Sequence, residues 1–117
     1  MDETCEMLIR SIKCTDPYTN LKRACEKIRE NLETFELLEN YDIMKNNIRS
    51  LRLTGGDYAS EQERLNAEYK RLRLIPELAE YFRLYDKISE YIDGVVITVW
   101  DCLENDISII DPSIPLG

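Results

Sequence analysis

Apolar residues recur at helical spacing along most of the chain, and no stretch alternates long enough to indicate a β-sheet. Apolar positions within residues 3–14 predict a short first helix that begins with an acidic turn. Asp16 followed by Pro17 predicts the start of a second helix, because an acidic cap and a proline at the first helical position favour initiation. The apolar face of this second helix consists of Leu21, Ala24, Cys25, Ile28 and Leu32.

A polar interruption at residues 31–34 predicts a bend or break after the second helix. The apolar pattern restarts at Phe35 and continues to Leu51. The glycine pair Gly55-Gly56 is a strong stop signal, because glycine accepts the backbone conformation that ends helices. We therefore expect a third helix that ends just before this pair.

The segment Ser60-Glu61-Gln62-Glu63 has the composition of a capping box, in which the serine oxygen and the second glutamate satisfy free amides of the first turn. We therefore expect a fourth helix to begin at Glu61. Ile75-Pro76 predicts a kink or short break after it, since proline lacks an amide hydrogen and restricts the residue before it.

The most regular pattern of the chain follows Pro76. Its main apolar residues are spaced alternately by four and three, which is a heptad seam, and a second stripe makes the apolar face wider than a two-stranded seam requires. The seam consists of Leu74, Leu78, Tyr81, Tyr85, Ile88, Ile92, Val95, Val99 and Cys102, and the second stripe of Phe82, Val96, Trp100 and Leu103. This pattern predicts one long helix over residues 76–104.

The predicted long helix exceeds the size of a compact domain of this length. Twenty-nine helical residues span about 44 Å, whereas a compact globule of 117 residues has a diameter of about 35 Å. Part of the apolar face should therefore remain for a partner, and a two-fold dimer is the simplest way to cover it. A monomeric bundle with the helix broken at Gly94 is the alternative. The predicted interface residues are Leu78, Tyr81, Tyr85, Ile88, Ile92, Val95, Val99 and Trp100.

The last residues, 105–117, are apolar but contain two prolines, so they predict an extended tail. Such a tail is either a strap over an apolar groove or a frayed terminus. The expected architecture is therefore a single domain over residues 1–117 of the all-α class. It is an elongated array of about five helices whose long C-terminal helix forms an oligomer interface.

The charge balance bears on the kind of partner. The chain has 23 acidic and 15 basic residues and a formal net charge of −8, which disfavours direct binding of nucleic acid or of anionic lipid headgroups. The cluster Lys70, Arg71 and Arg73 is either a solvated helix face or a basic docking spot. No apolar run is long enough for membrane insertion. An acidic N-terminus is unlike a signal peptide, so we expect a cytoplasmic protein.

Catalytic and metal chemistry have little support in the sequence. The chain contains no histidine, which excludes mechanisms based on imidazole. Its four cysteines lack the spacing of a metal site, and we expect small buried thiols rather than ligands. We expect no catalytic residue, no metal and no cofactor. A cysteine-based redox or iron–sulfur sensor remains an alternative, as does an enzyme. The cysteines are Cys5, Cys14, Cys25 and Cys102.

Several segments together resemble the YlbF/YmcA family of small helical bacterial proteins, over roughly residues 7–104. They are the segment Tyr18-Thr19-Asn20-Leu21-Lys22-Arg23-Ala24, the polar break before Phe35, the glycine loop at 55 and 56, the capped helix from Ser60, Pro76-Glu77-Leu78, and the long final helix ending near Leu103. The resemblance implies an elongated all-α protein that oligomerises through long helices and has no enzymatic activity of its own.

The resemblance also implies a regulatory function. Family members are regulatory factors of Gram-positive bacteria linked to competence, sporulation and biofilm formation, and some act in a heteromeric complex that directs the membrane-anchored endoribonuclease Y. The expected partners are therefore a second copy, in a dimer or tetramer, related helical proteins in a hetero-oligomer, and a ribonuclease. Three of the four cysteines precede residue 26, a distribution unlike that of cluster-binding members, so cluster binding is not carried over.

Overall fold

The computed structural model describes residues 2–107, and every regular element within that range is an α-helix. The expected all-α class, with five helices and a long last one, is confirmed. The helices are α1 (Glu3–Lys13), α2 (Asp16–Arg29), α3 (Leu32–Leu53), α4 (Ala59–Leu72) and α5 (Pro76–Ile107). In this described part of the chain no helix is long and apolar enough to cross a membrane.

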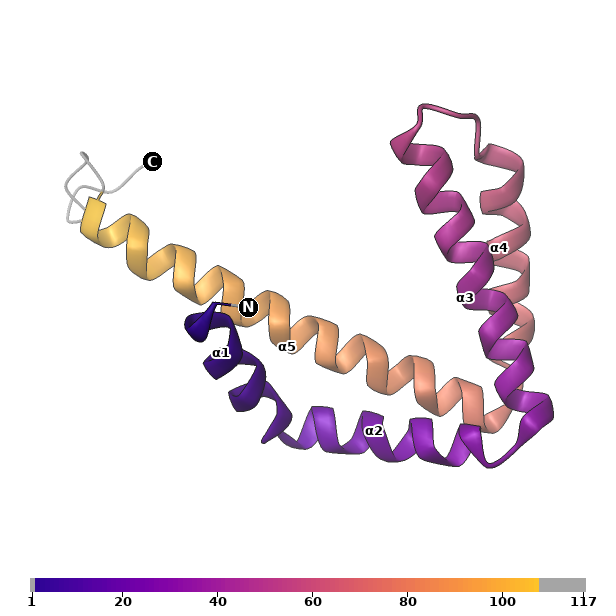
Figure 1. The fold of residues 1–117 in the computed structure, drawn as a ribbon, viewed down its shortest axis with the longest axis horizontal. Helices are drawn as coiled ribbons and strands as arrows, with labels where there is room; N and C mark the ends of the chain where they lie inside the picture. The colour runs from indigo at the N-terminus through magenta and orange to yellow at the C-terminus, as the bar shows by residue number, and fades with distance from the viewer. Residues whose placement is uncertain (1, 108–117) are drawn as a thin grey trace, which may run out of the picture.

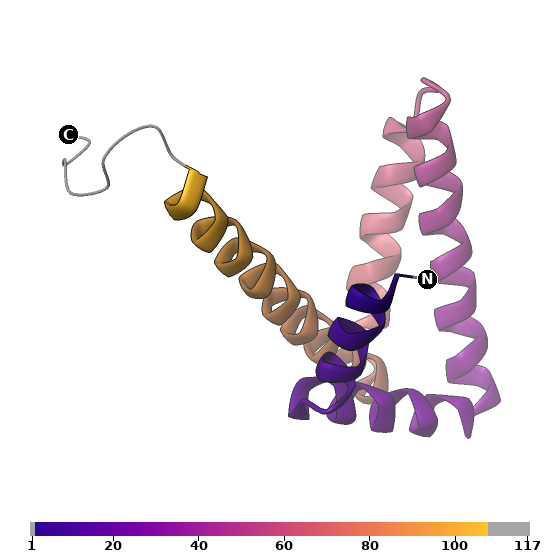
Figure 2. The same cartoon turned by 60° about the vertical axis from the view of Figure 1, so that its left-hand side comes forward.

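The molecule is an open V (Figure 1). Helix α2 packs along the first part of α5, and the α3–α4 hairpin rises from that end as one arm, while the rest of α5 forms the other arm. Turning the molecule keeps the two arms apart (Figure 2). The radius of gyration is 19.2 Å and the extents are 56 × 38 × 32 Å, compared with a radius of about 13 Å for a compact chain of this size. The elongated shape is therefore confirmed.

The first two helices begin with side-chain caps. Asp2 accepts a hydrogen bond from the amide of Thr4 at 2.8 Å. The prediction that Asp16 caps α2 is wrong by one residue: Thr15 is the cap, and its Oγ1 accepts from the amide of Tyr18 at 3.5 Å. Asp16 is instead the first helical residue, where its negative charge favours the helix N-terminus.

The break before α3 and the stop after it are confirmed. Asn31 caps α3 by accepting from the amide of Thr34 at 3.4 Å. At the other end, Gly55 has a φ of 76°, in the left-handed region that glycine tolerates best. The amide of Gly56 then donates to the carbonyl of Leu51 at 2.8 Å, which closes the last turn.

The predicted capping box is wrong. Helix α4 begins at Ala59, two residues before the expected start at Glu61, and Ser60 lies inside its first turn. The carboxylate of Asp57 accepts from the amide of Ala59 at 3.1 Å and so satisfies a free donor at this end. A short acidic side chain two residues before the helix thus performs the role assigned to Ser60.

The core lies where α2, the hairpin and the start of α5 meet. Its best-buried side chains are Ile28, Leu72 and Leu78, each at most 2% exposed. An aromatic group extends this core: the ring centroids of Tyr69 and Phe82 are 4.8 Å apart, and those of Tyr41 and Phe82 are 5.5 Å apart, both in edge-on geometry. The core therefore fixes the hairpin to α5 at one end of that helix only.

Helix α5 is one unbroken helix of 32 residues, so the alternative with a break at Gly94 is not observed. Pro76 begins it after a short turn, which confirms the predicted break at Ile75-Pro76. The helix includes residues 105–107, which were predicted to begin an extended tail; helix is possible there because no proline lies between Pro76 and Pro112. The rest of the predicted tail lies outside the described residues.

Candidate protein interface

Burial divides α5 into two halves at Ile88. The inner half, residues 76–88, contains every buried side chain of the helix, namely Leu78, Phe82, Leu84 and Ile88. The outer half, residues 89–107, contains none. Nineteen residues correspond to about 28 Å of helix. More than half of the longest helix therefore projects beyond the core.

The predicted interface residues also differ in burial on the two sides of this boundary. Leu78 and Ile88 are buried among the chain's own helices, and Tyr81 is half-buried. Leu74, the first residue of the predicted seam, lies in the turn before α5 and is 82% exposed. The remaining members are at the surface or only half-buried: Tyr85, Ile92, Val95, Val99 and Trp100. The structure therefore leaves the outer members of the predicted set available for contact.

The exposed apolar side chains of the outer half form a continuous band, which we call the apolar strip. Its residues recur at intervals of three and four, so they share one face of the helix. Their exposed fractions are 38% for Ile92, 49% for Val96, 51% for Val99, 57% for Trp100, 48% for Leu103 and 71% for Ile107. Contiguous exposed apolar bands of this kind are typical of interaction surfaces.

Besides Tyr91, which is 41% exposed, two exposed apolar residues of the outer half lie outside the two predicted stripes. Ile97 is 60% exposed and Ile107 is 71% exposed. Ile97 lies outside the two predicted stripes, although the run Val95-Val96-Ile97 in the sequence indicated that the apolar face widens there. Ile107 belonged to the predicted tail. Both extend the surface beyond the predicted set.

The first helix adds a second apolar surface. No residue of α1 is buried, although its sequence is amphipathic, and α1 packs principally against α2. Met7 is 61% exposed and Leu8 is 47% exposed. The end of the molecule that carries α1 and the outer half of α5 therefore has two helix faces that residues 2–107 do not bury.

The corner of the V is built from aromatic side chains of α3, α4 and α5. Burial raises the pKa of Tyr81 to about 12, and the nearby Asp42 carboxylate acts in the same direction. Burial also raises the pKa of Tyr41. Lys45 lies over the rings of Tyr41 and Tyr85, with its Nζ 5.8 and 5.5 Å from the two ring centroids. The corner is thus an aromatic cluster beside which Lys45 and the carboxylates of Asp42 and Asp86 also lie.

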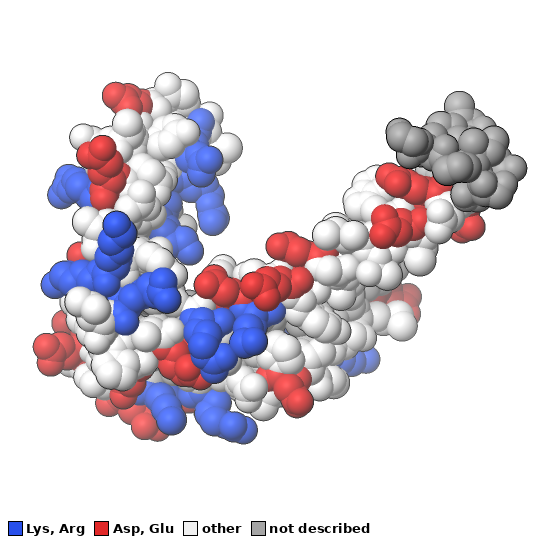
Figure 3. All heavy atoms as spheres, turned by 180° about the vertical axis from the view of Figure 1, so that it is seen from behind, with Lys and Arg blue, Asp and Glu red and all other residues white. Residues whose placement is uncertain are grey.

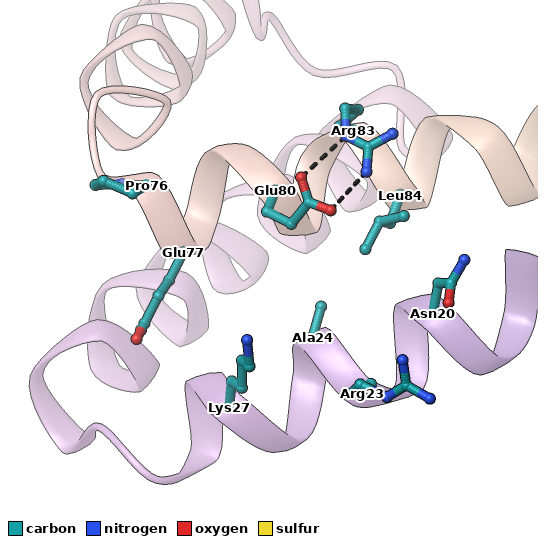
Figure 4. Close-up of a pocket in the computed structure, with 9 residues that line it drawn as sticks. All are labelled: Asn20, Arg23, Ala24, Lys27, Pro76, Glu77, Glu80, Arg83 and Leu84. Carbon is teal, nitrogen blue, oxygen red and sulfur yellow. Dashed lines mark hydrogen bonds and ion pairs between the residues drawn. The ribbon is translucent and has the colours of Figure 1, made fainter.

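A groove of about 490 Å³ lies on another side of the molecule, between α2 and the inner half of α5. Figure 4 shows Ala24 and Leu84 facing each other across it, with the ion pair of Arg83 and Glu80 near its edge. Arg83 donates from Nε to Glu80 at 2.9 Å, and this bond lowers the pKa of that carboxyl. The groove has side chains of both charge signs, so its lining does not select one class of ligand.

The cysteines are more exposed than expected. The prediction of buried thiols is wrong for Cys5, Cys14 and Cys102, which are exposed, because α1 and the outer half of α5 are not covered by other helices. Cys25 is half-buried, and burial raises the pKa of its thiol. Within residues 2–107, no three histidine, cysteine, aspartate or glutamate side chains converge in the manner of a metal site.

An elongated array of five helices, with an exposed apolar strip on the outer half of the longest one, defines a class of small helical proteins. A family model described as control of competence regulator ComK, YlbF/YmcA, matches residues 1–102. The chain belongs to the YlbF/YmcA family, which is a family of regulatory proteins.

Structural comparison agrees with this assignment. A solved structure from Bacillus stearothermophilus, described as a protein of unknown function (DUF964), is similar to this chain with a TM-score of 0.77 and 20% sequence identity. The similarity covers 92% of this chain and 96% of that one, so the two share the fold over nearly their whole length. A comparison with curated proteins gave no match.

Proposed function

We propose that the protein is a non-enzymatic regulatory adaptor that assembles through the outer half of α5 and modulates a protein partner. The observation that carries this proposal is the apolar strip: six large apolar side chains on one helix face, none of them buried within the part of the chain that the structure describes. Leaving such a face in water is unfavourable, and covering it with another helix recovers the hydrophobic free energy.

Family membership supports a proposal for the partner. Membership in a family of competence regulators supports a role in developmental control. Related helical proteins are suitable hetero-oligomer partners, because they can supply a matching amphipathic helix. We further propose that the assembly acts on a ribonuclease Y complex in RNA processing, as the family resemblance implies. The net charge of −8 supports action through protein contacts rather than through direct binding to RNA.

The test uses a substitution that the fold should tolerate. Val99 is 51% exposed, so Val99→Asp should leave the helical fold intact while placing a charge in the proposed interface, which disfavours association. In a host strain lacking the protein, wild type should restore transcript processing and should co-purify with ribonuclease Y or with related helical proteins. Val99→Asp should do neither.

Asn105→Asp is the matched control. It adds the same charge to the same half of α5, but residue 105 lies on the face opposite the apolar strip, since 100° per residue places it far from Val99. This variant should behave as wild type. Normal complementation by a folded Val99→Asp variant, or the absence of any processing defect in the deletion strain, would contradict the proposal.

A further inference from the structure

Basic and acidic side chains are unevenly distributed over the two arms of the V. Figure 3 shows basic side chains gathered on the hairpin arm and acidic ones along the α5 arm. The outer half of α5 contains five acidic residues and no lysine or arginine. The α3–α4 hairpin contains eight acidic and six basic residues, but four of the acidic ones precede residue 43, and residues 43–75 contain seven basic and four acidic residues. The charge difference therefore lies between particular faces of the two arms and not between the arms as wholes.

The hairpin wall that faces α5 is basic. Lys45 marks this wall, because its Nζ lies 5.5 Å from the ring centroid of Tyr85 on α5. Arg49 and Arg52 follow it at intervals of four and three, so they continue the same face of α3. We call these three residues the basic stripe. Neither of the ion pairs found within residues 2–107 includes any of them.

The α5 wall that faces the hairpin is acidic. Glu90 lies in a hollow at the corner of the V, which is also lined by Tyr69 of α4, by Arg73 just after that helix, and by Arg83 and Lys87 of the inner half of α5. Asp93, Asp101 and Glu104 lie three, eleven and fourteen residues further on, which are helical intervals that repeat the same face. These four exposed carboxylates form an acidic edge beside the apolar strip. The two walls of the V therefore have complementary charges but are held apart by the core.

We infer that the V is the docking site for the outer half of α5 of a second copy of this chain, with the acidic edge of each copy against the basic stripe of the other. In this two-fold arrangement the apolar strips cover one another at the same time. Because the arms diverge, a single chain cannot bring its own acidic edge to its own basic stripe.

Charge complementarity favours this occupant. If two outer halves paired along their length without the hairpins, their acidic edges would approach one another with no basic residue to neutralise them, which is unfavourable. Insertion into the V of the partner replaces that repulsion by attraction to the basic stripe. An isologous contact of this kind also closes on itself and leaves no free end for further growth.

The inference deepens the proposed function, because it rests on assembly through the outer half of α5 and names the surface that receives it. It also makes a distinct prediction about salt. Charge contacts at the edge of an interface are screened by added salt, whereas purely apolar contacts are not weakened by it. Dissociation of the wild-type dimer should therefore become easier as the NaCl concentration rises.

Charge reversal tests the inference directly. The first variant carries Arg49→Glu and Arg52→Glu, and the second carries Asp101→Lys and Glu104→Lys; all four side chains are exposed, so both should keep the helical circular dichroism of wild type. Each variant alone should self-associate at least about tenfold more weakly, since like charges then oppose one another. An equimolar mixture should recover a heterodimer of near wild-type affinity, measured by sedimentation velocity with one variant labelled.

Two outcomes would overturn the inference. One is self-association of both single variants at wild-type strength, which would leave the proposed assembly through the apolar strip intact but place it elsewhere on the partner. The other is a mixture that associates no better than its components, as expected if an acidic segment of a different protein occupies the V. A wild-type chain that stays monomeric throughout would instead remove the homo-oligomer on which the inference rests.

Discussion

Tyr81 shows how a single side chain at the corner of the V responds to its surroundings. Burial raises the pKa of Tyr81 to about 12 from an ordinary value of 10.0. Below about pH 10 both the folded and the unfolded chain hold the neutral phenol, so stability is unaffected there. Between about pH 10 and 12 the unfolded chain releases the proton while the folded chain keeps it. The free energy of unfolding should therefore fall over this interval.

The measurement is urea unfolding at a series of alkaline pH values, with Tyr81→Phe as the control. The variant lacks the hydroxyl, so its stability should fall less steeply above pH 10, with the remaining loss due partly to Tyr41, whose pKa is also raised. Identical pH profiles for the two proteins would show that Tyr81 ionises as freely in the fold as in the unfolded chain.

At the scale of elements, the turn between α4 and α5 separates two leucines with opposite roles. Leu72 is fully buried at the end of α4, whereas Leu74, two residues later, is 82% exposed. Leu72→Ala should lower the free energy of unfolding by about 2–5 kcal/mol, because it leaves a cavity in the core. Leu74→Ala should change it by no more than about 0.5 kcal/mol. Chemical denaturation of both variants tests this; equal losses would mean that the turn packs differently.

The number, type and order of the helices could be predicted from the sequence, because apolar spacing, the Gly55-Gly56 pair and Pro76 are local signals. The predicted starts of the helices were less accurate. Thr15 and Asp57 satisfy the first-turn amides of α2 and α4, although Asp16 and Ser60 are equally suitable cap residues by type. Which of two neighbouring candidates acts as the cap depends on the path of the preceding chain, and local sequence does not define that path.

The division of α5 into a buried inner half and an exposed outer half could not be predicted either, and the reason is different. The heptad seam continues unchanged from Leu78 to Val99, so its inner and outer halves have the same pattern. The two halves differ only because α2 and the hairpin pack against residues 76–88 and bury the apolar face there, whereas they leave the same face exposed further along the helix. The charge difference between facing sides of the arms was missed as well, because the basic stripe and the acidic edge face each other only once the V has formed.

At the scale of the whole molecule, the central claim is that the outer half of α5 is an assembly surface. The V shape is stable as a scaffold, because the core fixes the hairpin, α2 and the inner half of α5 together. The same arrangement leaves the outer 19 residues of α5 outside the core, with the apolar strip exposed. We propose that a helix of matching pattern covers this strip and that a second copy of the chain supplies it.

The most direct measurement is the molar mass of the wild-type chain by light scattering over a wide range of concentration. We predict a mass of at least twice the 13.8 kDa of one chain at high concentration, with a decrease toward the single-chain value on dilution. Val99→Asp should remain near the single-chain mass where the wild type and Asn105→Asp are associated. A constant 13.8 kDa for the wild type at every concentration would contradict the claim.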